Sequence, residues 1–142
     1  MNMQALEPLV GDWRVEISHP SQDAPIGGAT SFAWLEGGGY LIQRSVTDDP
    51  RFPKGIMVIG PTAAGDRIVQ HYFDSRGVAR IFDISLEDGV LRLWRDDEDF
   101  AQRYAGRFSD DTTTMTGAFE ICRDGTAWVR DFDITYAKVS GA

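Results

Sequence analysis

Hydrophobic and polar positions alternate along most of the chain with the period of β-strands. From Trp13 to Ser18 the alternation is strict, and Trp13, Val15 and Ile17 share one phase. Successive side chains of a strand point to opposite faces of a sheet, so this period predicts a half-buried strand. Further runs of this kind, or short wholly apolar runs, occur at 30–34, 40–46, 56–59, 68–73, 78–84, 90–94, 102–108, 115–121 and 128–139.

Turn signals rich in glycine, proline and aspartate separate these runs, mostly every 8–12 residues, which is typical of a sandwich or a barrel. No amphipathic helix of useful length lies between the runs, so parallel βαβ units are excluded. Consecutive hairpins favour an up-and-down barrel, and closure removes exposed sheet edges. We predict an all-β fold, an antiparallel up-and-down β-barrel of about ten strands in a single domain spanning residues 1–142.

The segment 3–9 differs from the rest, because Ala5, Leu6 and Leu9 have a spacing that suits one or two helical turns. We therefore predict a short N-terminal helix. Trp13 follows it at the start of the first strand, and we interpret Trp13 as a structural residue that plugs the barrel end near the helix.

Composition and charge narrow the classes of partner. The chain has 142 residues, is 42% hydrophobic and carries a formal net charge of −8. A negative surface repels phosphate backbones and anionic headgroups, so neither nucleic acid nor a membrane is an expected partner. A single cysteine, Cys122, permits no intramolecular disulfide. The N-terminus lacks the pattern of a signal peptide and no apolar run approaches the ~20 residues of a membrane span, so we predict a cytoplasmic protein.

Catalytic and cofactor motifs are sparse. His19, His71 and Cys122 have no second ligand at metal-binding spacing, and we expect neither a metal nor another cofactor. The sequence has no Gly-x-Ser-x-Gly elbow, although a Ser-His-Asp arrangement stays open because such residues converge only in the fold. The acidic run at 96–99 is interpreted as a solvated loop tip. His71 and Tyr104 are weak catalytic candidates.

Four arginines fall in the same phase as apolar strand residues: Arg44, Arg80, Arg92 and Arg130. If the apolar phases face inward, these guanidinium groups lie in the barrel interior. Buried charge is costly, so they would need carboxylate partners, water or an anionic ligand. A guanidinium suits a carboxylate because its planar fork donates two parallel hydrogen bonds. The alternative is that the apolar residues of some strands face outward, or that internal carboxylates such as Glu16, Glu120 or Asp131 pair with these arginines.

The positions that share a phase with apolar strand residues also indicate which residues bind a ligand. His71 lies in phase with apolar neighbours and could act as a proton shuttle, or be an ordinary core residue. Tyrosines could orient a ligand through their hydroxyls or simply pack in the core. The predicted ligand-binding residues are Trp34, Tyr40, Arg44, His71, Arg80, Arg92, Trp94, Arg130 and Phe132.

The segment Leu9-Val10-Gly11-Asp12-Trp13 resembles the Gly-x-Trp that opens the first strand of lipocalin-like (calycin) barrels. With further segments the resemblance covers nearly the whole chain and extends to a bacterial group of uncharacterised lipocalin-like barrels. Those segments are Trp34-Leu35-x-Gly-Gly-x-Tyr40-Leu41, Tyr72-Phe73-Asp74-Ser75-Arg76-Gly77, Phe108-Ser109-Asp110-Asp111 with Met115-Thr116-Gly117, and Asp131-Phe132-Asp133-Ile134-Thr135.

The resemblance implies a barrel with a short helix near one end. Relatives in the wider group bind fatty acids, retinoids or haem, and some barrels of similar size are cyclases. The related haem-binding barrels use a histidine on a late strand. This chain has no histidine after His71, so haem is not expected.

The leading functional prediction is the binding of a small hydrophobic or amphipathic molecule, anionic in character, inside the barrel. The first alternative is a barrel enzyme, such as a cyclase or isomerase, that acts through positioning, a tyrosine or His71. The second is a filled barrel whose outer surface binds a protein partner. Homodimer formation is left open.

Overall fold

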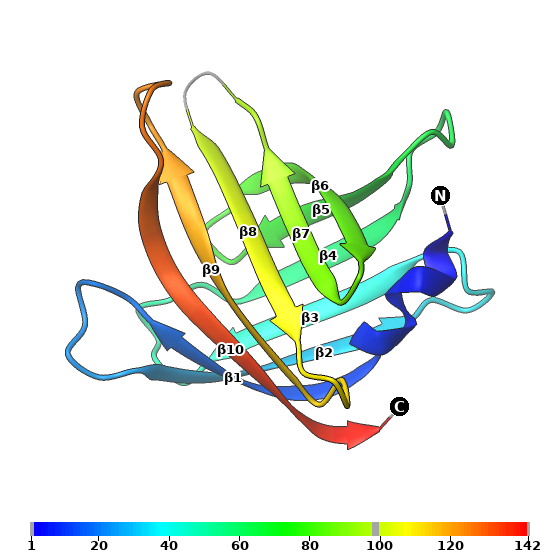
Figure 1. Ribbon diagram of the computed structural model, residues 1–142, viewed down its shortest axis with the longest axis horizontal. Helices are drawn as coiled ribbons and strands as arrows, with labels where there is room; N and C mark the ends of the chain where they lie inside the picture. The colour runs from blue at the N-terminus through cyan, green and yellow to red at the C-terminus, as the bar shows by residue number, and fades with distance from the viewer. Residues whose placement is uncertain (1, 98–99, 142) are drawn as a thin grey trace.

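The computed structural model describes residues 2–97 and 100–141, in which a single antiparallel sheet closes on itself as a barrel (Figure 1). Each strand pairs with its neighbours in sequence, and the last strand closes on the first. This confirms the predicted all-β, up-and-down barrel of ten strands. The strands are β1 (Gly11–Ser18), β2 (Ile26–Trp34), β3 (Leu41–Thr47), β4 (Gly55–Pro61), β5 (Ile68–Asp74), β6 (Ala79–Glu87), β7 (Val90–Arg95), β8 (Ala101–Phe108), β9 (Thr114–Cys122) and β10 (Val129–Gly141).

A short 3-10 helix, η1 (Met3–Leu9), lies at the barrel end where β1 begins, which we call the plugged end (Figure 1). Its Leu6 and Leu9 are buried, and the indole Nε1 of Trp13 donates a hydrogen bond to the Leu9 carbonyl at 2.8 Å. Trp13 itself is 2% exposed. The short helix and the plugging position of Trp13 are as predicted. Within the described chain, no helix has the length and hydropathy needed to cross a membrane.

The opposite end, which we call the open end, carries the loops after β1, β3, β5, β7 and β9. Phe32, Leu41 and Ile59, which face inward near the plugged end, are buried. Inward-facing side chains nearer the open end, such as Leu93 and Phe119, are only partly buried. Part of the apolar inner wall toward the open end, including Leu93 and Phe119, is therefore not fully covered by the protein itself.

β10 departs from regular pairing at one place that matters for the site. Arg130 pairs with Glu120 of β9 and Phe132 pairs with Phe119, so one extra residue, Asp131, stands between them. Such a bulge reverses the alternation of side chains along a strand. Residues on the two sides of Asp131 therefore do not share a phase.

Candidate functional site

We call the inner side of the open half of the barrel the cup, and three apolar side chains line part of it. β7 contributes Leu93, β9 contributes Phe119 and β10 contributes Phe132, and all three pack against the core while remaining partly exposed. The registers place them inward, because Leu93 pairs with Tyr104 and Phe119 pairs with both Tyr104 and Phe132. Phe132 belongs to the predicted ligand-binding set.

Five rings form a continuous aromatic row from the interior to the open end: Tyr104, Phe119, Phe132, His19 and Phe52. Successive ring centroids lie 4.8, 4.8, 6.4 and 6.5 Å apart, within the range of favourable aromatic pairs. The first three rings come from β8, β9 and β10, and the last two from the loops after β1 and β3. The row lines one side of the cup with aromatic side chains that pack on one another.

Tyr104 occupies the inner end of the aromatic row and is 3% exposed. Among the described residues its hydroxyl has no hydrogen-bond partner. Burial, with a smaller contribution from nearby Tyr136, raises the pKa of Tyr104 well above its ordinary value. The hydroxyl is therefore protonated at physiological pH and is a hydrogen-bond donor inside the barrel.

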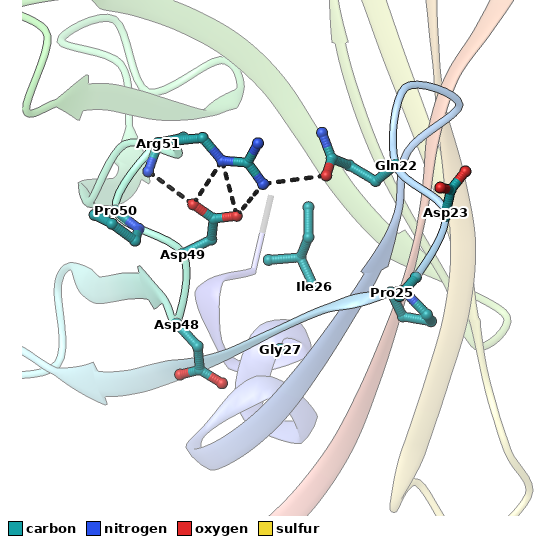
Figure 2. A pocket seen from close by; sticks show the side chains of 10 residues that line it. Gln22, Asp23, Pro25, Ile26, Gly27, Asp48, Asp49, Pro50 and Arg51 are labelled. Atoms are coloured by element: carbon teal, nitrogen blue, oxygen red, sulfur yellow. Dashed lines mark hydrogen bonds and ion pairs between the residues drawn. The ribbon is translucent and has the colours of Figure 1, made fainter.

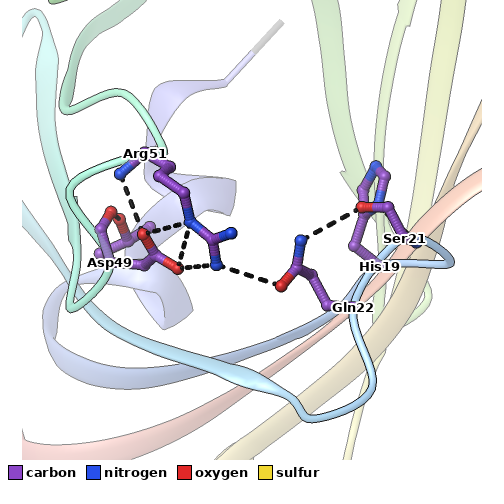
Figure 3. Close-up of polar contacts among 6 residues, drawn as sticks. His19, Ser21, Gln22, Asp49 and Arg51 are labelled. Atoms are coloured by element: carbon purple, nitrogen blue, oxygen red, sulfur yellow. Dashed lines mark hydrogen bonds and ion pairs between the residues drawn. The ribbon is translucent and has the colours of Figure 1, made fainter.

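A polar cluster stands at the mouth of the cup (Figure 3). The backbone N–H of Ser21 donates to His19 Nδ1 at 3.1 Å, and Ser21 Oγ lies 2.6 Å from the same nitrogen. A nitrogen that accepts from a backbone N–H carries no proton, so the proton of the neutral imidazole lies on Nε2. His19 Nε2 is 3.8 Å from Asp131 Oδ1. The serine hydroxyl thus has a base beside it, and that base faces a carboxylate.

The cluster continues across the mouth to the loop after β3. Gln22 Nε2 donates to Ser21 Oγ at 3.4 Å, and Arg51 Nη2 donates to Gln22 Oε1 at 3.1 Å. Arg51 also forms an ion pair with Asp49 at 2.6 Å, and its hydrogen bonds lower the pKa of Asp49 to about 2. Figure 2 shows Arg51 and Gln22 facing each other above Ile26. The two loops border a groove of about 640 Å³, lined by residues 22–27 and 48–51.

Arg80 is the one inward-facing arginine among the four singled out in the sequence. It pairs with Tyr72 in the β5–β6 ladder and shares its face with the buried Phe82. Its guanidinium carbon lies 4.7 Å from the ring centroid of Phe100, a cation–π distance. Within the described part of the chain no carboxylate lies at ion-pair distance from Arg80. The charge therefore stands near the open end of the cup, with no anionic partner among residues 2–97 and 100–141.

The prediction that Arg44 and His71 face inward is wrong. On β3 the inward phase holds Gln43, which is 5% exposed and accepts a hydrogen bond from Gln70 of β5, while Arg44 is exposed. His71 lies between two inward-facing residues of β5 and is also exposed. The apolar residues Ile42 and Val46 lie on the outer face of β3, so apolar character does not mark the inner phase there.

The inward placement predicted for Arg92, Trp94 and Arg130 is also wrong. Leu91 and Leu93 fill the inner phase of β7, so Arg92 and Trp94 project outward. Arg130 lies beyond the bulge, is exposed, and forms an ion pair with Asp133 at 2.6 Å. These three residues line a shallow depression of about 520 Å³ on the outer wall, whose other lining residues include Ala105 and Ala118.

The remaining two residues of the predicted set lie at the plugged end. Trp34 faces inward, and its indole Nε1 donates to Glu7 Oε2 of η1 at 2.7 Å. Tyr40 is 42% exposed and its ring covers the backbone at Gly60. Both residues lie at the plugged end of the barrel, so neither belongs to the cup.

Sequence reasoning did not identify His19, Ser21 and Asp131 as a cluster, nor Phe119 and Phe52 as members of the aromatic row. The only signal for Phe119 is its phase with Met115 on β9, and the loop residues have no periodic signal at all. Among the described residues, no group of three or more histidine, cysteine, aspartate or glutamate side chains could hold a metal ion.

Comparison with known proteins supports the fold and identifies no function. No family model and no curated protein matches the chain. The structure is similar to that of Rv2717c from M. tuberculosis, with a TM-score of 0.66 and 14% identity over 97% of both chains. It is also similar to a protein of unknown function from the DUF3598 family of Nostoc punctiforme, with a TM-score of 0.61 and 12% identity. That match covers 98% of this chain and 49% of the other.

Proposed function

We propose that the protein binds a small amphipathic molecule, with an apolar body in the cup and an anionic group near Arg80. The observation that carries the proposal is a group of partly exposed apolar side chains on the inner wall near the open end. Leu93, Phe119 and Phe132 face inward there and are only partly buried. Apolar walls that water can reach gain about 25 cal/mol per Å² when a ligand covers them. Concave, mostly apolar sites with a few polar groups are the usual form of small-molecule sites.

The anionic character of the ligand rests on Arg80. A guanidinium that faces the cup and has no carboxylate partner among the described residues can offer two parallel hydrogen bonds to a carboxylate. The aromatic face of Phe100 holds the group from one side. An amphipathic acid places its charge at the mouth, where water still contributes to solvation, and its tail against the aromatic row.

Two neighbouring residues of β7 test whether binding occurs inside the barrel. Leu93 faces the cup and Trp94, 41% exposed, faces outward. We expect saturable binding of the fluorescent polyene acid cis-parinaric acid, weakened at least fivefold by Leu93→Gln and unchanged by Trp94→Gln. Circular dichroism and urea unfolding of both variants show whether the barrel is intact. The proposal is overturned if the parent protein shows no saturable binding, or if both variants lose affinity equally.

A second candidate function is hydrolysis of a carboxylic ester, favoured by the contact between Ser21 and His19. In this reaction Ser21 Oγ attacks the carbonyl carbon, His19 Nδ1 takes the hydroxyl proton and returns it to the departing alcohol, and water then releases the acid by the same route. A fluorophosphonate should label Ser21, and His19→Gln should abolish the labelling. Absence of labelling in the parent protein would remove this candidate and leave the binding function untouched.

A further inference from the structure

Four neighbouring strands of the barrel, β3 to β6, carry apolar side chains on their outer surface. Cross-strand pairing places the outward-facing residues of these strands side by side in three rows. The row nearest the open end is Arg44, Ile56, Phe73 and Ala79, the middle row is Ile42, Val58, His71 and Ile81, and the row nearest the plugged end is Gly60, Val69 and Asp83, with the ring of Tyr40 over Gly60. We call these residues the outer apolar face.

Large apolar side chains of this face are exposed to solvent. Ile56 and Phe73 are neighbours in one row and are 44% and 47% exposed, and Ile81 in the next row is 55% exposed. Single exposed apolar residues are common, whereas a contiguous group of them marks an interaction site. The barrel wall separates this face from the cup, so a ligand in the cup does not cover it. The face is therefore suited to the surface of another macromolecule.

The charges of the outer apolar face indicate which macromolecule that is. The whole chain has 22 acidic residues and a net charge of −8, but the three rows contain a single carboxylate, Asp83, and a single guanidinium, Arg44. Arg44 ends the row nearest the open end at β3, and Asp83 ends the row nearest the plugged end at β6, so the two charges occupy diagonally opposite corners. Arg44 is exposed, and no carboxylate of the described residues lies at ion-pair distance from it. Asp83 lies 3.6 Å from Arg67 and its side chain is 29% exposed, so it can accept a second cation.

A face with opposite charges at opposite corners is complementary to a second copy of itself. A two-fold axis that lies in the plane between two copies, perpendicular to the Arg44–Asp83 diagonal, places each Arg44 opposite Asp83 of the other copy. Because an isologous contact repeats every interaction, two such ion pairs form, one at each end. The apolar side chains of the rows then cover one another. Two molecules of net charge −8 repel each other, and contact through this face brings few carboxylates together.

We propose that the outer apolar face is the interface of a two-fold symmetric homodimer, held by its apolar rows and by reciprocal Arg44–Asp83 ion pairs. The inference goes beyond the proposed binding function and does not depend on it. Strands about 4.8 Å apart and rows about 6.7 Å apart give the face an outline of about 400 Å². Standard interfaces bury about 800 Å² on each partner, so this dimer is a weak one, with a dissociation constant between about 10 µM and 1 mM.

Sedimentation velocity of the full chain between about 10 µM and 1 mM tests for the dimer. We expect the weight-average sedimentation coefficient to rise with concentration from that of a monomer toward that of a dimer. Ile81→Lys places a charge in the middle row and should remove the rise. Val129→Lys is the matched control and should retain it, because Val129 on β10 is also 55% exposed and lies outside the face. Both variants reduce the net negative charge by one, so stronger general repulsion cannot explain a loss of association.

An exchange of charges tests how the two copies are oriented. Arg44→Asp places like charges together at both ends of the interface and should weaken the dimer about fivefold or more. The double exchange Arg44→Asp/Asp83→Arg restores opposite charges at each contact and should recover most of this loss. The two positions are opposite corners of the face within one molecule, so the recovery requires a second copy. Circular dichroism and urea unfolding show whether each variant keeps the fold of the parent.

Each outcome supports or overturns the dimer. A parent protein that stays monomeric up to about 1 mM overturns the proposal and leaves a different protein as the occupant of the face. Equal loss of association in Ile81→Lys and Val129→Lys, or no recovery in the double exchange, overturns it as well. If Ile81→Lys does not fold, the concentration dependence of the parent and the exchange of charges still test the interface. A negative result leaves ligand binding in the cup untouched.

Discussion

Arg130 and Phe132 are two residues apart on β10, yet their side chains lie on opposite faces of the barrel wall. Arg130 pairs with Glu120 on the outside, whereas Phe132 stacks on Phe119 inside. The residue between them, Asp131, is the extra residue of the bulge, and its carboxylate faces His19 and Gln102 at the mouth. One inserted residue thus excludes an arginine from the cup and provides a carboxylate at its rim.

This arrangement predicts that Arg80, rather than Arg130, recognises an acidic ligand. We expect Arg80→Met to weaken dodecanoate binding about three- to tenfold relative to dodecanol. The charge-assisted hydrogen bonds lost are worth about 1.5–3 kcal/mol in a buried site, and solvent at the half-buried Arg80 reduces this value. Displacement of cis-parinaric acid measures both affinities.

Arg130→Met is the matched control, because it removes the same charge from the outer wall. It should leave both affinities unchanged. Equal losses for the acid and the alcohol in Arg80→Met, or a selective loss of the acid in Arg130→Met, would contradict the placement of the anionic group.

The fold could be predicted from the sequence because its signals are local. The alternation around Trp13 and the frequent turns depend on residues close together in the chain. Those signals determine the positions of the strands and the hairpins that connect them. An up-and-down barrel is built from such consecutive hairpins. The short N-terminal helix and the plugging role of Trp13 followed from the same patterns.

The site could be predicted only in part. Which face of the sheet a side chain occupies, and which distant residues meet in the fold, do not depend on the local sequence alone. On β3 the apolar Ile42 and Val46 face outward and the polar Gln43 faces inward, so the apolar phase indicated the wrong face for Arg44. The bulge at Asp131 has no signal in the sequence. His19 and Asp131 come from opposite ends of the chain and meet only because β10 closes on β1.

The plug at the helical end gives a prediction about stability. Trp13 donates a hydrogen bond to the Leu9 carbonyl and packs against Phe108, with ring centroids 6.1 Å apart. Trp13→Phe removes the donor and leaves a small cavity, so we expect the free energy of unfolding to fall by about 1–3 kcal/mol. Urea unfolding measures the loss. Trp94→Phe on the outer wall should change the free energy of unfolding by less than about 0.5 kcal/mol, and a similar effect of both substitutions would refute the structural role of Trp13.

Two strand glycines should differ in their tolerance of a methyl group. A Cβ at Gly117 would lie 2.6 Å from the Cα of Gly106 and would press on the Ala105 carbonyl, so the backbones of β8 and β9 would have to separate. The three atoms nearest to a Cβ at Gly60 all belong to the ring of Tyr40, which is exposed and can rotate away. We expect Gly117→Ala to lower the free energy of unfolding by about 2 kcal/mol or more, and Gly60→Ala by less than about 1 kcal/mol. Thermal and urea unfolding of the two variants give the comparison, and the reverse order would show that the β8–β9 backbones are not in close contact.

The carboxyl group of Asp74 makes the stability of the open end depend on pH. Arg76 donates to its Oδ2 at 2.7 Å and Tyr72 donates to the same oxygen at 2.6 Å. These hydrogen bonds, that of Arg76 above all, hold the pKa of Asp74 well below its ordinary value near 3.8. A carboxyl whose pKa is lower in the folded state than in the unfolded state stabilises the fold fully above the unfolded value. That stabilisation disappears as the pH falls through the folded value.

Asp74→Asn removes the charge at every pH and keeps the shape of the side chain. We expect the parent to be more stable than the variant by about 1–2 kcal/mol between pH 5 and 7, and the difference to shrink below about pH 4. Burial and the hydrogen bond to Asp74 raise the pKa of Tyr72 to about 12, so in the variant the pKa of Tyr72 should fall toward its ordinary value of 10.0. Urea unfolding at a series of pH values measures the first effect, and ultraviolet titration of the phenol measures the second. Asp110→Asn, on an exposed turn, should show neither effect. A stability difference that grows on acidification would contradict the direction assigned to Asp74, because a charge that stabilises the fold must lose its effect when it is protonated.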